Sequence, residues 1–185
     1  MLNIIAGTLS VGVTPSTNSY ESIATVTVGS GGSSSIDFTS ISSSYTHLQI
    51  RGLFRQASGE AIIIRFNGDT GNNYACHALY GDGATASANA AASRTNIPIE
   101  RNSGMPTGAN IFGAGVIDIL DYKNTNKYKT VRSLSGHDSN GSGYVHLESG
   151  LWMNTNAITS IKLTTPSAFN YAEFTQFALY GIKGV

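Results

Sequence analysis

The chain has 185 residues, a length that fits one domain with a hydrophobic core of its own. Only 12% of the residues are charged and 21 are glycines, a composition that disfavours long helices and favours strands and turns. Eleven basic and eleven acidic residues cancel, which removes the basic field expected of a protein that binds nucleic acid or a membrane surface. The single cysteine excludes an internal disulfide and a zinc site built from several cysteines.

The N-terminal segment, residues 1–19, differs from the rest of the chain. It mixes short apolar runs with glycine, serine, threonine and proline, and it has neither the basic start of a signal peptide nor an uninterrupted apolar span. We therefore predict an extended arm at 1–19 and a single β-sandwich domain at 20–185. A segment without its own core becomes ordered on another molecule, so the arm is expected to anchor the protein. The anchoring residues would be Leu2, Ile4, Ile5 and Val11.

The body of the chain reads as a succession of short strands. "SIATVTVG" and "SSIDF" come first, followed by "THLQIRGLFR", in which Leu48, Ile50 and Phe54 alternate with polar residues as in a half-buried strand. Similar runs are "EAIIIRFNG", "NYACHALYG", "GAGVIDILDY", "NKYKTVRSLSG", "SGYVHLESGLWM", "ITSIKLTT" and "FNYAEFTQFALYGIK". Asn-Gly, Gly-Asp and similar clusters separate these runs, and such residues form the turns of antiparallel sheets.

Two stretches lack this alternation. The segment "ATASANAAAS", residues 84–93, has no large apolar face, and we expect an exposed loop or a short helix there; residues 102–110 form the second irregular stretch. The sequence contains no internal repeat, which argues against a propeller or a solenoid. The predicted fold is all-β, an antiparallel two-sheet β-sandwich of jelly-roll type with an extended N-terminal arm.

The most polar stretch is "RFNGDTGNNYACHALYGDG", residues 65–83. Its oxygen-rich side chains suit calcium, but their spacing does not match a calcium-binding loop, and Asn-Gly-Asp is equally a tight turn. We interpret the stretch as strand, turn, strand, turn, with Cys76 buried as a small apolar residue. An ion held near Asp69 and Asp82 remains the alternative.

Catalytic patterns are weak throughout the chain. The four histidines stand singly, no Gly-x-Ser-x-Gly elbow joins a strand to a helix, and Asp118 and Asp121 point to opposite faces of one strand. We therefore expect a protein that is not an enzyme and that has no catalytic, cofactor-binding or metal-binding residues. Oligomerisation is expected instead, because Ile62, Ile63 and Ile64 place apolar residues on both faces of one strand.

One polar and aromatic face is a candidate for binding. Four alternate positions of "YVHLESGLWM" share one side of the predicted strand, and a ring beside polar side chains can bind a sugar. This possible glycan or interface face comprises Tyr144, His146, Glu148 and Trp152. The alternative is that Trp152 packs in the core or in a contact between subunits.

The segments "RFNGDTGNNYACHALYGDG", "VIDILDYKNTNKYKTVRSLSG", "SGLWMNTNAITSIKL" and "FALYGIKG" resemble a family of small virion proteins of tailed bacteriophages, particularly phages of aquatic bacteria and cyanobacteria. The likeness covers roughly residues 35–185. It implies a β-rich virion component, similar to jelly-roll capsid cement proteins or to fibre and receptor-binding domains, and it supplies no active-site residue.

The resemblance, taken with the apolar arm, implies a capsid decoration or cement protein that stabilises the head shell, on the outer surface of the virion after synthesis in the host cytoplasm. Its expected partners are other copies of itself, with a homotrimer favoured, and the major capsid protein or another virion protein. The alternative is a tail fibre or receptor-binding domain that recognises host surface carbohydrate. A depolymerase is disfavoured because no pair of catalytic carboxylates is recognisable.

Overall fold

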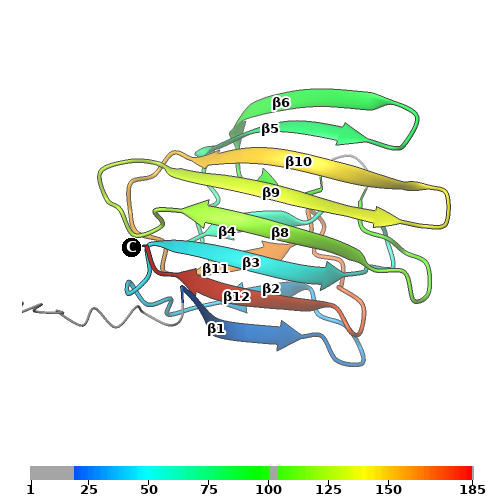
Figure 1. Cartoon of the computed structure of the whole chain (residues 1–185), viewed down its shortest axis with the longest axis horizontal. Coiled ribbons are helices and arrows are strands. Elements are labelled where there is room, and N and C mark those ends of the chain that lie inside the picture. Colours follow the sequence, from blue (N-terminus) through cyan, green and yellow to red (C-terminus); the bar gives the residue numbers. More distant parts are fainter. Residues whose placement is uncertain (1–18, 101–103, 185) are drawn as a thin grey trace, which may run out of the picture.

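The computed structural model describes residues 19–100 and 104–184. These residues form an all-β structure with no helix (Figure 1). The strands, in chain order, are β1 (Tyr20–Thr27), β2 (Ser35–Phe38), β3 (His47–Phe54), β4 (Ile63–Phe66), β5 (Tyr74–Gly81), β6 (Ala86–Arg94), β7 (Ile97–Pro98), β8 (Gly113–Leu120), β9 (Lys129–Asp138), β10 (Gly143–Trp152), β11 (Ile161–Thr164) and β12 (Gln176–Ile182). The predicted arm, residues 1–19, lies outside the described residues except for Ser19.

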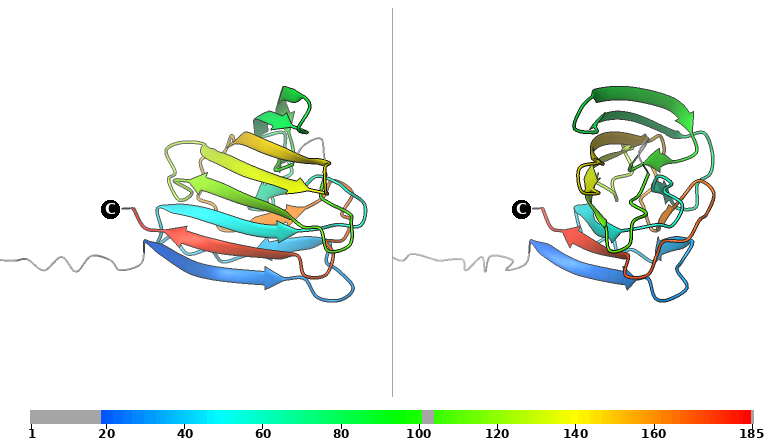
Figure 2. Two further views of the ribbon diagram at one scale, coloured as in Figure 1. Left: turned by 45° about the vertical axis from the view of Figure 1, so that its right-hand side comes forward. Right: turned by 90° about the vertical axis from the view of Figure 1, so that its right-hand side faces the viewer.

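The strands form two antiparallel sheets that pack as a sandwich, which confirms the predicted all-β, two-sheet architecture. The larger sheet has eight strands in the order β1-β12-β3-β8-β9-β10-β5-β6, and the smaller has four in the order β2-β11-β4-β7. Figure 1 looks onto the larger sheet with the smaller sheet behind it, and the turned views of Figure 2 show the two layers. One face of the larger sheet therefore covers the core, and the other is the outer surface of the molecule.

The order of the strands joins distant parts of the chain. β8, β9 and β10 follow one another as a meander, and β5 pairs with β6 as a hairpin. By contrast, β12 lies between β1 and β3, and β11 lies between β2 and β4. The first strand of each sheet is thus connected to the rest of that sheet only through one of the last two strands of the chain.

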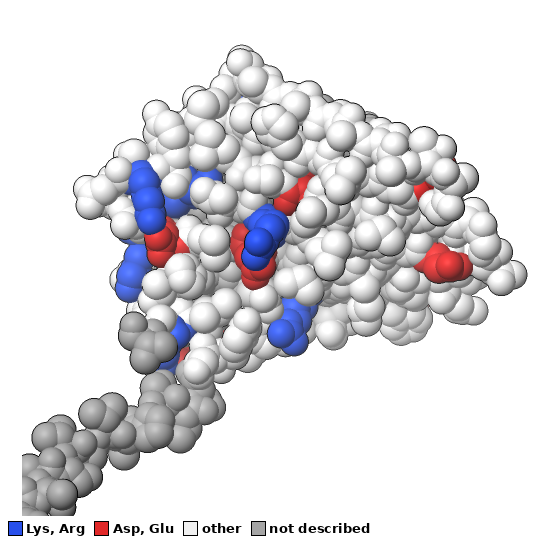
Figure 3. Space-filling view, turned by 45° about the horizontal axis from the view of Figure 1, so that its top comes forward, with Lys and Arg blue, Asp and Glu red and all other residues white. Residues whose placement is uncertain are grey.

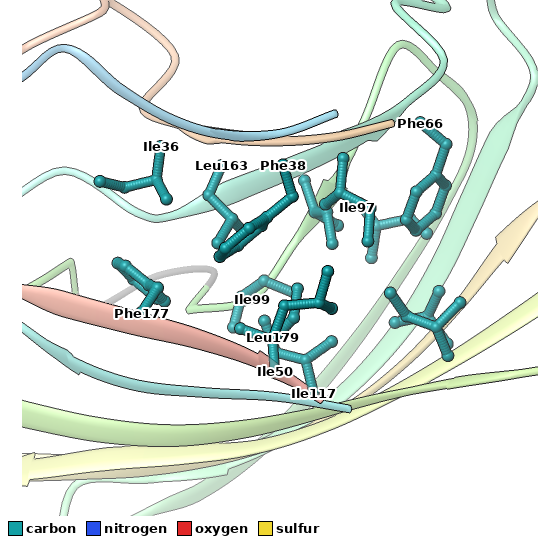
Figure 4. Packing of buried hydrophobic residues seen from close by; sticks show 14 of the residues in the cluster. Ile36, Phe38, Ile50, Phe66, Ile97, Ile99, Ile117, Leu163, Phe177 and Leu179 are labelled. Atoms are coloured by element: carbon teal, nitrogen blue, oxygen red, sulfur yellow. The ribbon is translucent and has the colours of Figure 1, made fainter. Parts of the chain in front are cut away.

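The core lies between the sheets and is filled by the alternate residues that point inward. Ile36 and Phe38 of β2 and Leu163 of β11 lie opposite Ile50 and Leu179 of the larger sheet (Figure 4). All five side chains are buried, and such packing supplies most of the free energy that stabilises a sandwich. Cys76 is buried in the same core, as predicted.

A second part of the core consists of aromatic rings. Trp152 of β10 packs with its ring centroid 5.5 Å from that of Phe66 and 6.3 Å from that of Tyr74. The indole Nε1 of Trp152 donates a hydrogen bond to Asp69 Oδ2 at 2.8 Å. The loop between β4 and β5 is thereby tied to the core.

The polar stretch at residues 65–83 has the predicted order of strand, turn, strand and turn. β4 ends at Phe66, and Asn67 and Gly68 adopt positive φ angles of 51° and 68° that reverse the chain. The amide of Asp69 donates to the carbonyl of Phe66 at 2.9 Å, and β5 begins at Tyr74. The concentration of Asn, Asp and Gly here provides turn geometry.

Two expectations from the sequence are wrong. The segment at 84–93 is neither a loop nor a helix, because β5 supplies hydrogen-bonding partners along it and it forms most of β6. Ile62, Ile63 and Ile64 leave no surplus apolar surface, because all three side chains are buried within the chain. The exposed apolar surface lies on the larger sheet instead.

Candidate interaction face

The outer face of the larger sheet carries a line of apolar side chains that runs across five neighbouring strands. The register places Val116 of β8 opposite Leu134 of β9, Leu134 opposite Leu147 of β10, Leu147 opposite Leu79 of β5, and Leu79 opposite Ala88 of β6. We call these five residues the apolar row. Because side chains at directly opposed positions are neighbours on a sheet, the row forms one continuous strip.

The four large members of the apolar row are unusually exposed. The exposed fraction is 57% for Leu134, 54% for Leu79, 45% for Leu147 and 37% for Val116. Two shallow hollows lie along the row, of about 510 Å³ beside Val116 and Leu134 and of about 550 Å³ beside Leu79 and Leu147. An exposed apolar patch that extends over several strands is typical of a surface that binds another macromolecule.

The neighbouring positions on the same face extend this patch. Val145 of β10 and Leu53 of β3 are 62% and 53% exposed, and the register places Gly136 of β9 directly beside Val145. Figure 3 shows that charged side chains are few on the visible surface and are separated by broad uncharged areas. The face therefore resembles the centre of a protein–protein interface more than an ordinary solvated surface.

A cluster of three polar side chains, from Gln49, Asp118 and Arg132, borders the apolar row on one side. Gln49 Nε2 of β3 donates to Asp118 Oδ1 of β8 at 2.8 Å, and Arg132 Nη2 of β9 lies 3.9 Å from Asp118 Oδ2. Asp118 thus accepts a hydrogen bond from a neighbouring strand and pairs with an arginine. These contacts fix the side chains beside the row.

Arg51 ends the apolar row at β3. Its Nε donates to Gln49 Oε1 at 2.9 Å, and its guanidinium carbon lies 5.8 Å and 5.5 Å from the ring centroids of Tyr20 and Tyr180. Cation–π contacts of this kind restrain the Arg51 side chain at the end of the row.

The four residues predicted as a glycan or interface face lie on the opposite side of β10. They share one side of the strand, as the alternation requires, but that side points into the molecule. His146, Glu148 and Trp152 are buried, and Tyr144 is half-buried. These side chains therefore form no accessible platform, because this side of β10 faces the interior of the molecule and not solvent.

A hollow of about 360 Å³ lies where the β5–β6 and β9–β10 turns meet. Its lining includes His137 and Tyr144, whose ring centroids are 6.1 Å apart, and the carboxylates of Asp82 and Asp138. One oxygen of each carboxylate caps its own turn. Asp82 Oδ1 accepts from the amides of Ala84 and Thr85, and Asp138 Oδ1 accepts from those of Asn140 and Gly141.

Asp69 is occupied by protein donors. Oδ1 accepts from the Gly71 amide at 2.8 Å, and Oδ2 accepts from Asn73 and Trp152 at 2.9 and 2.8 Å. Partial burial opposes ionisation of Asp69, but the bonds from Asn73, Trp152 and Gly71 outweigh it and lower its pKa. Among the described residues, no three or more His, Cys, Asp or Glu side chains are grouped so that they could hold a metal ion.

Glu100 is a buried carboxyl that the sequence did not single out. Desolvation on burial raises its pKa to about 8. Burial and then the charge of Glu100 raise the pKa of Tyr171 as well. The sequence gives no signal for this, because burial of Glu100 depends on packing between segments far apart in the chain.

The apolar row was also missed by sequence reasoning, although a signal exists. Leu134, Leu147 and Leu79 stand between polar or small residues in "RSLSG", "VHLES" and "HALYG", and their strands carry apolar residues on both sides. Alternation alone does not tell which side faces the core when both are apolar.

Comparison of the chain with protein-family models, with curated proteins and with solved structures finds no match. In the part of the chain that the structure describes, no helix is long and apolar enough to cross a membrane.

Proposed function

We propose that the chain is a non-enzymatic structural protein of a phage virion, namely a capsid decoration or cement protein on the outside of the head. The observation that carries the proposal is the exposed apolar row on the broad outer face of the eight-stranded sheet. A decoration protein acts by binding other virion proteins, further copies of itself included, and an exposed apolar face suits such assembly better than it suits catalysis.

The sequence resemblance supports the same role. The segments that resemble small phage virion proteins include β5, most of β8 and β9, and the end of β10, which contribute Leu79, Val116 and Leu134 to the face. The likeness thus includes strands that build the proposed interaction surface.

The N-terminal arm would attach the sandwich to the shell. Its uncharged sequence contains Leu2, Ile4, Ile5 and Val11, and it precedes β1, an edge strand of the larger sheet. An apolar segment that leads into an edge strand can extend onto a neighbouring protein and bind it by main-chain pairing and by small side-chain pockets.

Deletion of residues 1–18 tests this attachment. We expect the shortened protein to keep the circular dichroism spectrum of a folded β-sandwich and to lose co-sedimentation with particles that lack the native protein. The matched control is the full chain carrying Leu2→Val and Ile4→Val, which keeps the arm apolar and should still bind. Normal binding by the shortened protein would refute the anchor.

A receptor-binding or fibre domain is the second candidate. The observation that favours it is the hollow at the turn end of the sandwich, where the rings of His137 and Tyr144 lie beside Asp82 and Asp138. An aromatic ring can stack on the C–H face of a sugar, and a carboxylate can accept hydrogen bonds from its hydroxyls. Quantifying the protein per particle separates the two roles, since decoration requires many copies over the head and a fibre only a few at the tail.

A further inference from the structure

We propose that the outer face of the larger sheet binds the same face of a second copy of this chain, so that two subunits pair around a two-fold axis. The pairing rests on the face being an interaction surface, as proposed above, but not on the virion assignment. It names both the partner and the residues that meet.

A second copy is the occupant that the described residues favour. Other large exposed apolar residues away from this face lie singly in loops, namely Tyr128, Phe169 and Phe174. A three-fold assembly would bury the face against a different surface of its neighbour, and the described residues offer no second apolar surface of this breadth. The partner that matches the face is the face itself, which is the defining property of a two-fold interface.

The position of the axis follows from the apolar row. Its four large side chains come from β8, β9, β10 and β5, so their midpoint lies between β9 and β10. A two-fold axis parallel to the strands at this point brings Leu134 against Leu147 of the partner subunit and Val116 against Leu79 of the partner subunit. All four large side chains of both copies are then buried together.

The row of residues that contains Val145 and Gly136 is compatible with the same two-fold rotation. Val145 is the most exposed apolar side chain of the face, and the axis brings it against Gly136 of the partner subunit. Because Gly136 presents no side chain, the isopropyl group of Val145 meets only main-chain atoms at that position and no opposing side chain. Two such contacts form, one on each side of the axis.

The charges of the face are compatible with this pairing. The register aligns Asp118 of β8, Arg132 of β9, Ser149 of β10 and His77 of β5 in a polar row beside the apolar one. The axis brings Asp118 opposite His77 of the partner subunit and Arg132 opposite Ser149 of the partner subunit. At the end of the apolar row, Arg51 comes opposite Ala88 of the partner subunit. Like charges are not opposed at these positions, so burial of the row is not offset by repulsion.

The size of the face suits a stable pair. Six strands, β3 to β6 in the sheet order, at a spacing of about 4.8 Å, and three to four rows about 7 Å apart give roughly 700 Å² per subunit. A standard stable interface buries about 800 Å² per partner. Two sheets packed face to face also reproduce the usual geometry of a β-sandwich core.

Sedimentation equilibrium of the full chain and of the variant Leu134→Glu/Leu147→Glu tests the pairing. The full chain should sediment as a dimer, and the variant as a monomer with an unchanged circular dichroism spectrum, because both positions are exposed and four carboxylates would meet at the axis. We expect the dissociation constant to rise at least about 100-fold, as for substitutions at the centre of an interface. Phe174→Glu, an exposed loop position, is the control and should remain dimeric.

A cross-linking experiment tests the axis itself. Cys76 is buried, so Val116→Cys and Leu79→Cys each add one accessible thiol. An oxidised mixture of the two variants should yield a disulfide-linked Val116→Cys/Leu79→Cys pair far more efficiently than either variant alone.

A monomeric full chain, a trimer, or a dimer unaffected by the glutamates would overturn the proposal. The proposal would also be overturned if the full chain were a monomer and only the chain without residues 1–18 formed dimers, because the arm of the same chain would then cover the face. These measurements use purified protein, so their outcome is separate from attachment to particles.

Discussion

Glu100 makes the stability of the protein depend on pH. Its pKa is raised to about 8 by burial, whereas the unfolded chain titrates near 4.5, so the folded state binds more protons between these values. Stability should therefore be highest at low pH within this window and fall as the pH rises through it, by up to about 1.4 kcal/mol per pH unit from this group. Glu100→Gln should remove this slope. Urea denaturation at about pH 5 and about pH 8 measures it, and an equally steep loss in the variant would contradict the assignment.

Asp69 joins the turn between β4 and β5 to the aromatic part of the core. Asp69→Ala removes the acceptor of the Trp152 indole and of two further donors, and we expect the free energy of unfolding to fall by about 1–3 kcal/mol. Asp82→Ala is the matched control, since Asp82 caps an exposed turn without contacting the core. A larger loss for Asp82→Ala than for Asp69→Ala in thermal denaturation would show that the link to Trp152 is unimportant.

At the scale of the elements, glycines in the central strands of the larger sheet leave space into which aromatic rings pack. A Cβ atom on Gly52 of β3 would lie 2.5 Å from Cε1 of Phe177, and one on Gly113 of β8 would lie 2.4 Å from Cε2 of Phe54. The two rings stack with centroids 6.0 Å apart. Each glycine thus creates the space that a ring fills, which keeps neighbouring strands close to the second layer.

Gly52→Ala should destabilise the fold by about 1–3 kcal/mol, because the added methyl group forces Phe177 from its position in a packed core. Gly29→Ala, where no atom lies within 4 Å of the new Cβ, is the control and should change stability little. Guanidinium denaturation of both variants provides the comparison. Equal stability of the two would mean that Phe177 moves without cost.

Strand prediction from the sequence succeeded where side chains contrast and failed where they do not. In β3, Leu48, Ile50 and Phe54 are buried while Arg51 is exposed, as alternation predicts. β6 was missed because alanine, serine and asparagine give almost no contrast between faces, and the cause of strand formation there is the neighbouring β5. β3 could be predicted and β6 could not, because β6 depends on pairing with another strand, and the local pattern of residues gives no information about that pairing.

At the scale of the whole molecule, the sequence identified which residues share a face but not which face is outside. On β10, Tyr144, His146 and Trp152 alternate with Val145 and Leu147, and both sets are partly apolar. The smaller sheet and its loops decide the outcome by covering the first set. The interaction face could be located only after the register had aligned single leucines from three strands and a valine from a fourth into one row.

The position of β11 and β12 has a consequence for how the protein is made. β1 and β2 leave the ribosome first, yet each pairs only with a strand near the end of the described chain. Until β11 and β12 are synthesised, both early strands lack their strand partners and expose apolar side chains, and neither sheet can be completed. Folding of this sandwich is therefore expected to be largely post-translational, and an unfinished chain would be a better substrate for chaperones than the finished one.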